Sequence, residues 1–239
     1  MSRPALALIA LILLAFGIVA LTGSRHADPT PQEKDAQEQE QQKDALIKQA
    51  EEQKQKAQTL AAAPNRQNAF DAVKTGAIRA KLEFEGHSPM TLEFYPQAAP
   101  KTVAHLSELI NQHFYDGILV HRVEKGFVVQ AGDPESKKLK PDDLRGMNST
   151  DVRNKFHLGG GGSGKTVPLE AKLPHLQYSL GLARSQAEDS GDSQFYINLN
   201  DNGAALDGKY CVFGRIIDGQ KTADEIQIGD RIKSFTLLP

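Results

Sequence analysis

The sequence predicts a mainly β domain whose antiparallel sheet closes on itself, preceded by a hydrophobic segment and a polar spacer. Short apolar runs recur from residue 118 to residue 238, separated by Gly and Asp, while helical periodicity is scarce there. Residues 78–94 alternate between apolar and polar side chains on both sides of a turn, as the strands of a hairpin do. Many short strands at such spacing are typical of a barrel or sandwich.

Composition limits the classes of protein that the chain can represent. Its 239 residues, 39% of them hydrophobic, suit one sizeable domain with appendages. With 28 basic and 30 acidic residues the net charge is −2, so no general field attracts nucleic acid or an anionic surface. The single cysteine, Cys211, excludes an internal disulfide and lies in an apolar run, where we expect a buried thiol.

Residues 1–22 are predicted to be a signal anchor or a signal peptide. No charged residue occurs in residues 5–21, and Arg3 precedes this run. The run is at the short limit for a spanning helix and long for a signal-peptide core, and no clear cleavage site follows it. We favour an uncleaved anchor that holds the domain on the extracytoplasmic side of the cell membrane. A cleaved signal, which would leave a periplasmic or secreted protein, stays open.

Residues 23–70 form a spacer rich in Gln, Glu and Lys. These residues favour helices, but apolar side chains are few and no sustained heptad seam is present. The pattern therefore predicts a solvated helix or a partly disordered spacer in preference to a coiled coil. We expect a monomer, although pairing of the spacer with another chain stays open.

Residues 71–239 are predicted to form the globular domain, which begins with the hairpin of residues 78–94. Pro100 suits the first turn of a helix, and apolar residues recur at helical spacing from residue 101 to 114. A second short helix is expected at residues 222–226, and a long polar loop at residues 135–165. Six further runs predict strands: 118–123, 127–131, 178–183, 194–199, 210–217 and 232–238.

The run Gly159-Gly-Gly-Gly-Ser-Gly-Lys-Thr166 fits the phosphate-loop pattern G-x-x-x-x-G-K-[ST] letter for letter. That pattern binds phosphate only between a buried strand and a helix whose first N–H groups hold the ligand. The preceding residues are mostly polar, and Pro174 ends any helix that begins after the run. We therefore expect a flexible glycine loop and no bound nucleotide.

The stretch from residue 115 to 134 carries the strongest chemical signal. Arg122 ends one apolar run, and Gln130 lies eight residues later inside a second run. On a strand His121 faces away from Arg122, so we expect His121 to be buried rather than an acid–base partner. Phe127 and Gln130 differ in strand parity and would share one site only with a bend or bulge after Gly126. No nucleophile and no paired His or Cys ligands accompany them, so we expect no metal and no cofactor.

Several motifs in order resemble the cyclophilin-type peptidyl-prolyl cis-trans isomerases. The resemblance covers residues 73–238 and starts with Ala99-Pro-Lys-Thr-Val103, which resembles the start of the family's first helix. The remaining matches are Phe114-Tyr-Asp-Gly117, His121-Arg-Val123, Gly126-Phe-Val-Val-Gln-Ala-Gly-Asp133, Ser193-Gln-Phe-Tyr-Ile197, Leu206-Asp-Gly-Lys209 and Val212-Phe-Gly214.

The resemblance implies a closed eight-stranded antiparallel barrel with two capping helices and an active groove on its outside. It also implies isomerisation of Xaa-Pro bonds (EC 5.2.1.8) in proline-containing polypeptides, without a cofactor. By position, the catalytic residues would be Arg122, Phe127 and Gln130. The residues expected to bind the substrate would be Val128, Ala183, Arg184, Tyr196, Leu206 and Tyr210.

The chain departs from the family pattern at several positions around this groove. Val120 and Tyr196 each stand where Phe is common, Val128 replaces a common Met, and Ala131 replaces Gly. Ala205 stands where many members carry Trp, and Tyr210 where many carry His. The loop at residues 135–164 is also longer than usual. These changes leave the catalytic efficiency open and keep an alternative, a low-activity cyclophilin-like binding module or chaperone.

Overall fold

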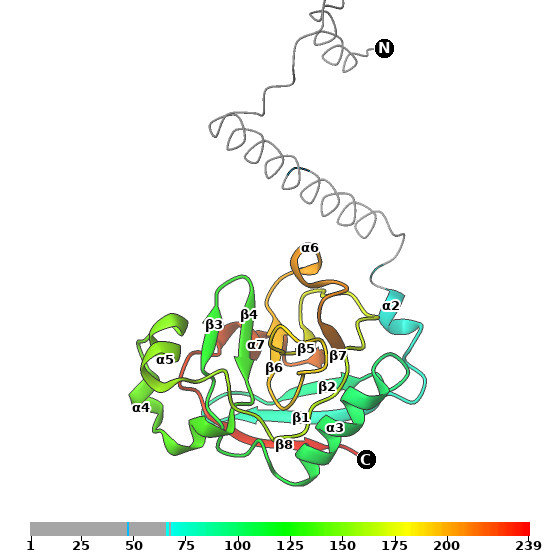
Figure 1. Cartoon of the computed structure of the whole chain (residues 1–239). Helices are drawn as coiled ribbons and strands as arrows, with labels where there is room; N and C mark the ends of the chain where they lie inside the picture. Colours follow the sequence, from blue (N-terminus) through cyan, green and yellow to red (C-terminus); the bar gives the residue numbers. More distant parts are fainter. Residues whose placement is uncertain (1–46, 48–65, 67) are drawn as a thin grey trace, which may run out of the picture. The chain divides into compact units, whose positions relative to one another are not determined.

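The computed structural model describes residue 47, residue 66 and residues 68–239 (Figure 1). The predicted anchor at residues 1–22 and most of the predicted spacer lie outside the described residues. Within the described part, no helix combines the length and apolar character needed to cross a membrane.

Eight strands form one antiparallel sheet in the order β3-β4-β6-β5-β7-β2-β1-β8 (Figure 1). The apolar runs predicted as strands all contribute to it. The strands are β1 (Ile78–Phe84), β2 (Met90–Phe94), β3 (Arg122–Glu124), β4 (Val128–Ala131), β5 (Ser179–Leu182), β6 (Phe195–Asn198), β7 (Cys211–Asp218) and β8 (Ile232–Leu237).

The sheet is curled, but the closed barrel expected from the sequence is not confirmed. The outer strands β3 and β8 share no ladder. Instead, residues 117–120, which precede β3, hydrogen-bond to residues 229–232 around the start of β8: the Val120 amide donates to the Asp230 carbonyl over 2.8 Å, and the Ile232 amide to the Ile118 carbonyl over 2.8 Å. The gap between the outer strands is therefore bridged by an irregular segment rather than by strand pairing.

The first hairpin confirms the alternation seen in the sequence. In β1 the side chains of Ala80, Leu82 and Phe84 are buried, while the residues between them are partly exposed. Leu82 pairs with Met90 and Ala80 with Leu92, so the apolar side chains of both strands share one face. That face supplies one side of the main core.

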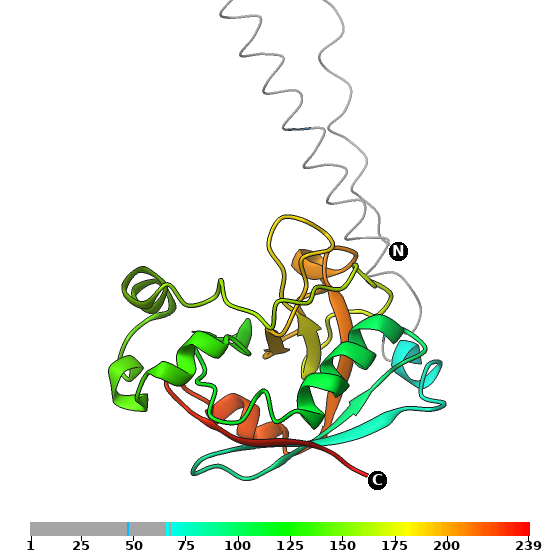
Figure 2. The same ribbon diagram turned by 60° about the horizontal axis from the view of Figure 1, so that its bottom comes forward.

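Two helices add side chains to this core. Helix α3 (Pro100–Asn111) was expected from its spacing and buries Val103, Leu106 and Ile110. Helix α7 (Gln220–Glu225) corresponds to the expected second short helix and buries Ala223. Figures 1 and 2 show both helices beside the curled sheet.

The long polar loop expected at residues 135–165 contains three helices instead: η1 (Pro134–Lys138), α4 (Pro141–Leu144) and α5 (Ser149–Phe156). The Asn148 side chain caps α5 by accepting the Asp151 amide over 2.9 Å. The buried side chains of Leu144, Val152 and Leu158 form a separate cluster with Leu119 and Ile228. Each of these short helices buries a single side chain, so no periodic apolar pattern marked them.

Packing also extends upstream of residue 71, where the domain was predicted to begin. Phe70, in α2 (Asn68–Asp71), is buried and packs against Tyr95, with 5.5 Å between ring centroids. Arg66 forms an ion pair with Asp207, 141 residues later in the chain. Residue 71 stays a predicted boundary, but residues 66 and 70 already contact the globular part.

Candidate active site

A groove of about 550 Å³ contains every residue that the sequence pointed to as a site residue. Strands β3, β4 and β6, the end of β5 and the region around α6 (Gly203–Leu206) contribute to it. The structure brings the nine predicted residues together, while their individual roles stay predictions: Arg122, Phe127, Val128, Gln130, Ala183, Arg184, Tyr196, Leu206 and Tyr210.

Arg122 and Gln130 face each other across the β3–β4 ladder. Their separation of eight residues in the sequence is thus the register of a hairpin. The Arg122 guanidinium donates from an Nη atom to the Gln130 Oε1 over 3.2 Å, and its Nε lies 3.7 Å from the Glu124 carboxylate. The side chain is 31% exposed, so the cation is held in place and still reaches the groove.

The bend expected after Gly126 is present. Gly126 has φ +71°, in the left-handed region that glycine adopts without strain, and the Phe127 amide donates to the Glu124 carbonyl over 2.9 Å. Strand β4 starts at Val128, so Phe127 stands outside the regular pleat. The Phe127 ring centroid lies 5.8 Å from the Arg122 guanidinium carbon, and Phe127 and Gln130 line the same groove.

A chain of amide side chains continues from Arg122 across the groove. Gln130 Nε2 donates to Gln194 Oε1 over 2.9 Å, and Gln194 Nε2 donates to the Gly161 carbonyl over 2.7 Å. A guanidinium only donates, so it fixes the orientation of both amides. Gln194 was not among the predicted site residues, although its motif at residues 193–197 was recognised.

The apolar wall of the groove comes from later parts of the chain. Tyr196 on β6 pairs with Gln130 on one side and with Gly181 on the other, and its ring is buried. The Tyr210 ring meets it edge-on, with 6.3 Å between centroids. The Arg184 guanidinium covers Tyr210 at 4.9 Å and donates to the Lys209 carbonyl. Leu206, at the end of α6, completes this wall.

The glycine run was expected to be a flexible loop, but two carboxylates hold it. The buried Asp133 accepts the amides of Gly159 (2.7 Å) and Gly161 (3.0 Å). Asp192 accepts the amides of Ser163 (3.0 Å) and Gly164 (2.9 Å). The run lies along the groove, and no described helix follows it before β5. Carboxylates of the protein itself thus occupy these amides, and the expected lack of a bound nucleotide stays a prediction.

Two titratable side chains, His121 and Cys211, are buried in the interior of the domain. His121 is 4% exposed, and burial lowers its pKa from 6.5 to about 4, because the Asp133 charge compensates only in part. Cys211 is 2% exposed, and burial raises the pKa of its thiol to about 11. Both residues were expected to be buried, and neither provides a reactive group to the groove.

Outside the groove, a smaller hollow of about 390 Å³ lies beside Phe70, Tyr178 and Arg215 and contains none of the predicted site residues. Over the described residues, no cluster of three or more His, Cys, Asp or Glu side chains is placed to hold a metal ion.

Comparison with known families assigns the fold and groove to one class of protein. The family model described as cyclophilin type peptidyl-prolyl cis-trans isomerase/CLD matches residues 79–236. A probable peptidyl-prolyl cis-trans isomerase of Brucella abortus (strain 2308) is 33% identical over 176 residues, which cover 70% of this chain and 85% of the relative. The chain therefore belongs to the cyclophilin-type peptidyl-prolyl cis-trans isomerases, a family that catalyses the cis-trans isomerisation of peptidyl-prolyl bonds, EC 5.2.1.8.

Other relatives agree with this assignment. Peptidyl-prolyl cis-trans isomerase B of Bacillus subtilis (strain 168) is 34% identical over 151 residues, 62% of this chain and 90% of the relative. A cyclophilin type isomerase from Cryptosporidium parvum, solved by crystallography, has the same fold, with a TM-score of 0.55 and 20% identity over 68% of this chain and 98% of that chain. A second structure of that protein, with a TM-score of 0.53 and 21% identity over 67% and 99% of the two chains, was determined in the presence of the dipeptide Ala-Pro.

Proposed function

We propose that this isomerase accelerates rotation of Xaa-Pro bonds by a hydrogen bond from Arg122 to the prolyl nitrogen. One observation carries the proposal: the fixed Arg122 guanidinium lies in the same groove as the apolar side chains of Phe127, Tyr196 and Leu206. A proline ring against those side chains would place its nitrogen near the cation. The presence of Ala-Pro in the related Cryptosporidium structure supports a proline-containing substrate.

The chemistry of the prolyl bond explains how an arginine can accelerate its rotation. A planar amide resists rotation with a barrier of about 18–20 kcal/mol, because resonance delocalises the nitrogen lone pair. In the twisted state the nitrogen regains that lone pair and accepts a hydrogen bond. The guanidinium stays charged and donates in a fixed fork, so Arg122 stabilises the twisted state more than the planar one. No covalent intermediate is required.

The size of the effect shows that Arg122 does not act alone. Acceleration from tens of seconds to milliseconds requires about 5–6 kcal/mol of differential stabilisation. A hydrogen bond to a charged group contributes about 1.5–3 kcal/mol. The rest must come from groups that favour the twisted geometry of the acyl side, while the apolar wall anchors the ring equally in the planar and the twisted state. Gln130 has the complementary role of orienting the substrate chain.

The proposal is tested by measuring isomerisation of an Xaa-Pro peptide by the full chain. We expect a rate well above that of the uncatalysed reaction, and a large loss in Arg122→Ala. Arg145→Ala is a matched control, because Arg145 is an exposed arginine that pairs with Asp142 outside the groove. A wild-type rate equal to the uncatalysed rate would contradict the proposed catalysis and leave the alternative of a binding module.

We propose further that the protein is exported and held at the membrane, so that its substrates are exported polypeptides. The uncharged run of residues 5–21, preceded by Arg3, supports this location. Fractionation of cells that produce the full chain should leave the protein in the membrane after alkaline extraction, and protease added from outside should degrade the domain. Recovery of the chain in the cytoplasmic fraction would contradict the proposal.

A further inference from the structure

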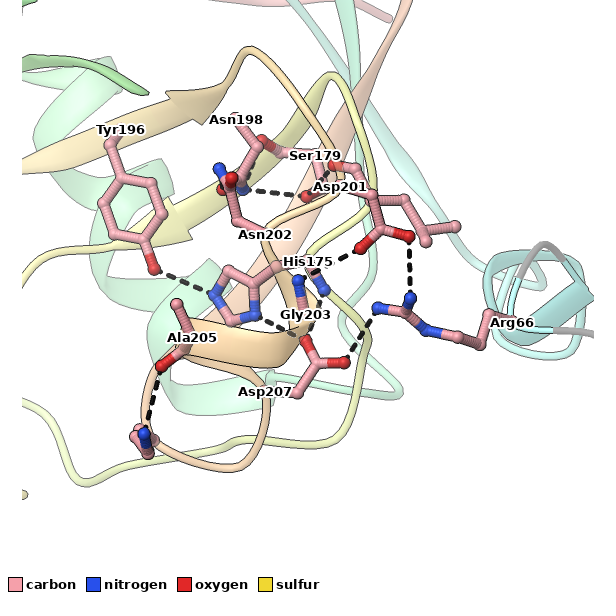
Figure 3. Close-up of polar contacts among 12 residues, drawn as sticks. Arg66, His175, Ser179, Tyr196, Asn198, Asp201, Asn202, Gly203, Ala205 and Asp207 are labelled. Atoms are coloured by element: carbon pink, nitrogen blue, oxygen red, sulfur yellow. Dashed lines mark hydrogen bonds and ion pairs between the residues drawn. The ribbon is translucent and has the colours of Figure 1, made fainter. Parts of the chain in front are cut away.

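A polar network joins Tyr196, which lines the groove, to Asp207, which follows the groove residue Leu206 in sequence (Figure 3). The Tyr196 hydroxyl and His175 Nε2 are 2.9 Å apart, and His175 Nδ1 lies 2.9 Å from Asp207 Oδ1. The other oxygen of Asp207 accepts from Arg66 over 2.9 Å. His175 has no exposed surface, and the Asp207 side chain is 3% exposed. None of the interactions in this network involves Arg122 or Gln130.

The charge of Asp207 fixes the direction of its hydrogen bond with His175. Burial alone would raise the pKa of the Asp207 carboxyl, but hydrogen bonds from His175 and the charge of Arg66 hold it below its usual value. Asp207 is therefore ionised and only accepts, so Nδ1 of His175 carries a proton. Nε2 is the ring nitrogen that remains to contact the Tyr196 hydroxyl, 2.9 Å away.

The position of the Tyr196 ring depends on this contact and on the space around it. Gly181, its neighbour on β5, has no side chain, and a Cβ there would lie 2.2 Å from the Tyr196 Cζ. The hydroxyl thus passes over Gly181 to His175, whose ring plane is within 13° of the tyrosine plane. A phenylalanine ring would occupy the same space without a fixed outer end.

The same network holds the second apolar side chain of the wall. Asp207 directly follows Leu206 and also accepts the backbone amide of His175 over 2.7 Å. The Asn202 amide donates to the His175 carbonyl over 2.9 Å, so the residues on both sides of α6 are tied to His175. Figure 3 shows His175 between Tyr196 and Asp207. Tyr196 and Leu206, which are distant in sequence, therefore share one support.

We propose that His175 and Asp207 are positioning residues that set the fit of the groove for the proline ring. They act through Tyr196 and Leu206 and do not contact the substrate. The inference rests on the proposed function of the groove, but it concerns binding of proline rather than the action of Arg122. It also supplies a use for the tyrosine hydroxyl at a position where phenylalanine is common in the family.

This role predicts a specific change in the affinity of the groove. The wall holds the proline ring in the planar and the twisted state alike, so its loss weakens binding and leaves the turnover of bound peptide nearly unchanged. Partial unfolding has a different signature, because it lowers the fraction of active protein without changing the dissociation constant of the folded fraction.

The test uses the full chain and an Ala-Pro peptide, with Kd measured by NMR titration and kcat by exchange spectroscopy. Tyr196→Phe removes only the hydroxyl. His175→Asn places a donor where Nδ1 stands and removes the Tyr196 contact, whereas His175→Gln places an amide where Nε2 stands and restores it. His87→Asn is the matched control, because His87 Nε2 lies 2.9 Å from Asp230 outside the groove.

We expect Tyr196→Phe and His175→Asn each to raise Kd about two- to tenfold, the range for loss of one hydrogen bond. The variant that combines both changes should have a Kd no higher than that of either single variant, and the Kd of His175→Gln and His87→Asn should stay within twofold of wild type.

Additive effects on Kd, or an unchanged Kd in Tyr196→Phe, would overturn the inference. If His175→Asn does not fold, the comparison of Tyr196→Phe with His175→Gln tests the inference. The inference then requires a raised Kd in Tyr196→Phe and an unchanged Kd in His175→Gln, and any other result overturns it. A wild-type chain that binds the peptide without turnover would count against the proposed isomerisation, while Kd would still test the positioning role.

Discussion

The Arg122 guanidinium is held by neighbouring side chains on one side and faces the groove on the other. A guanidinium has five N–H groups, and one Nη atom of Arg122 donates to Gln130 while its Nε lies 3.7 Å from Glu124. The Phe127 ring limits its movement from a third direction. The cation thus presents a defined set of donors to the groove before the substrate arrives, which is the preorganisation that electrostatic catalysis requires.

Gln194 should matter for activity through Gln130. In Gln194→Leu, the Gln130 amide loses the acceptor at 2.9 Å that fixes its orientation, so the Arg122 guanidinium is held less well. We expect kcat/KM for an Xaa-Pro peptide to fall about tenfold, which corresponds to about 1.4 kcal/mol. Gln177→Leu is the control, because this exposed glutamine donates to the Leu199 carbonyl outside the groove. Equal activities of the two variants would show that the amide chain does not support Arg122.

His121 should make the fold sensitive to acid. Burial depresses its pKa to about 4, so between about pH 6.5 and pH 4 the unfolded chain binds a proton that the folded chain does not. Stability contributed by the neutral ring is therefore present above pH 6.5 and decreases by up to about 3 kcal/mol as the pH falls to 4. Urea unfolding across this range should show a smaller pH dependence in His121→Asn than in the wild type. Parallel curves would mean that His121 does not titrate abnormally.

The loop elements around the groove hold their shape through backbone amides. The Asp133 carboxylate accepts from Gly159 and Gly161 with one oxygen and from Glu135 with the other. Because glycines supply no side-chain packing, these bonds fix the path of the loop beside the groove. The observed loop has the glycine-rich backbone of the phosphate-loop pattern, but the amides of the loop donate hydrogen bonds to carboxylates of the protein itself.

Asp133→Asn should destabilise the domain. An amide replaces one acceptor oxygen with a donor, so at least one buried loop amide faces another N–H group. We expect the free energy of unfolding to fall by about 1–3 kcal/mol, the cost of a buried unsatisfied group. Asp142→Asn changes an aspartate whose side chain is 86% exposed and should stay within about 0.5 kcal/mol of the wild type. Urea denaturation distinguishes the two, and an unaffected Asp133→Asn would show that the carboxylate is dispensable.

Elements that bury a continuous face were predictable from the sequence. The hairpin of β1 and β2 shows a period of two, and α3 buries Val103, Leu106 and Ile110 at helical spacing. Helices α4 and α5 were missed, because so few of their side chains are buried. The loop at Gly159 looked mobile, since its partners Asp133 and Asp192 lie 26 or more residues away in sequence.

At the scale of the whole molecule, the curled sheet assembles a groove from residues 122 to 210. Motif order identified most of the groove residues, since four of the matched motifs, at residues 121–123, 126–133, 193–197 and 206–209, carry side chains that line the groove. His175 belongs to none of the matched motifs, and nothing in the sequence linked it to Asp207, although Asp207 lies in the motif Leu206-Asp-Gly-Lys209. They are 32 residues apart, and His175 lies in an irregular segment whose partners only the folded sheet brings together.

Cys211 should report on opening of the whole domain. Its thiol is buried in the main core on β7, and burial raises its pKa to about 11. A thiol reagent attacks the thiolate, so we expect labelling only after the core opens. Its rate, measured with Ellman's reagent in increasing urea, should follow the global unfolding equilibrium. Labelling in native buffer as fast as a free cysteine would show that β7 opens locally.

The central claim is that the Arg122 guanidinium acts on the twisted prolyl bond. The most direct test is kcat for cis-trans exchange of a saturating Xaa-Pro peptide, measured by NMR exchange spectroscopy on wild type and Arg122→Lys. Lysine keeps the charge but loses the planar fork. The account predicts at least a roughly tenfold fall in kcat with peptide Kd within about threefold, because the lost interaction belongs to the transition state. An unchanged kcat in Arg122→Lys would contradict it.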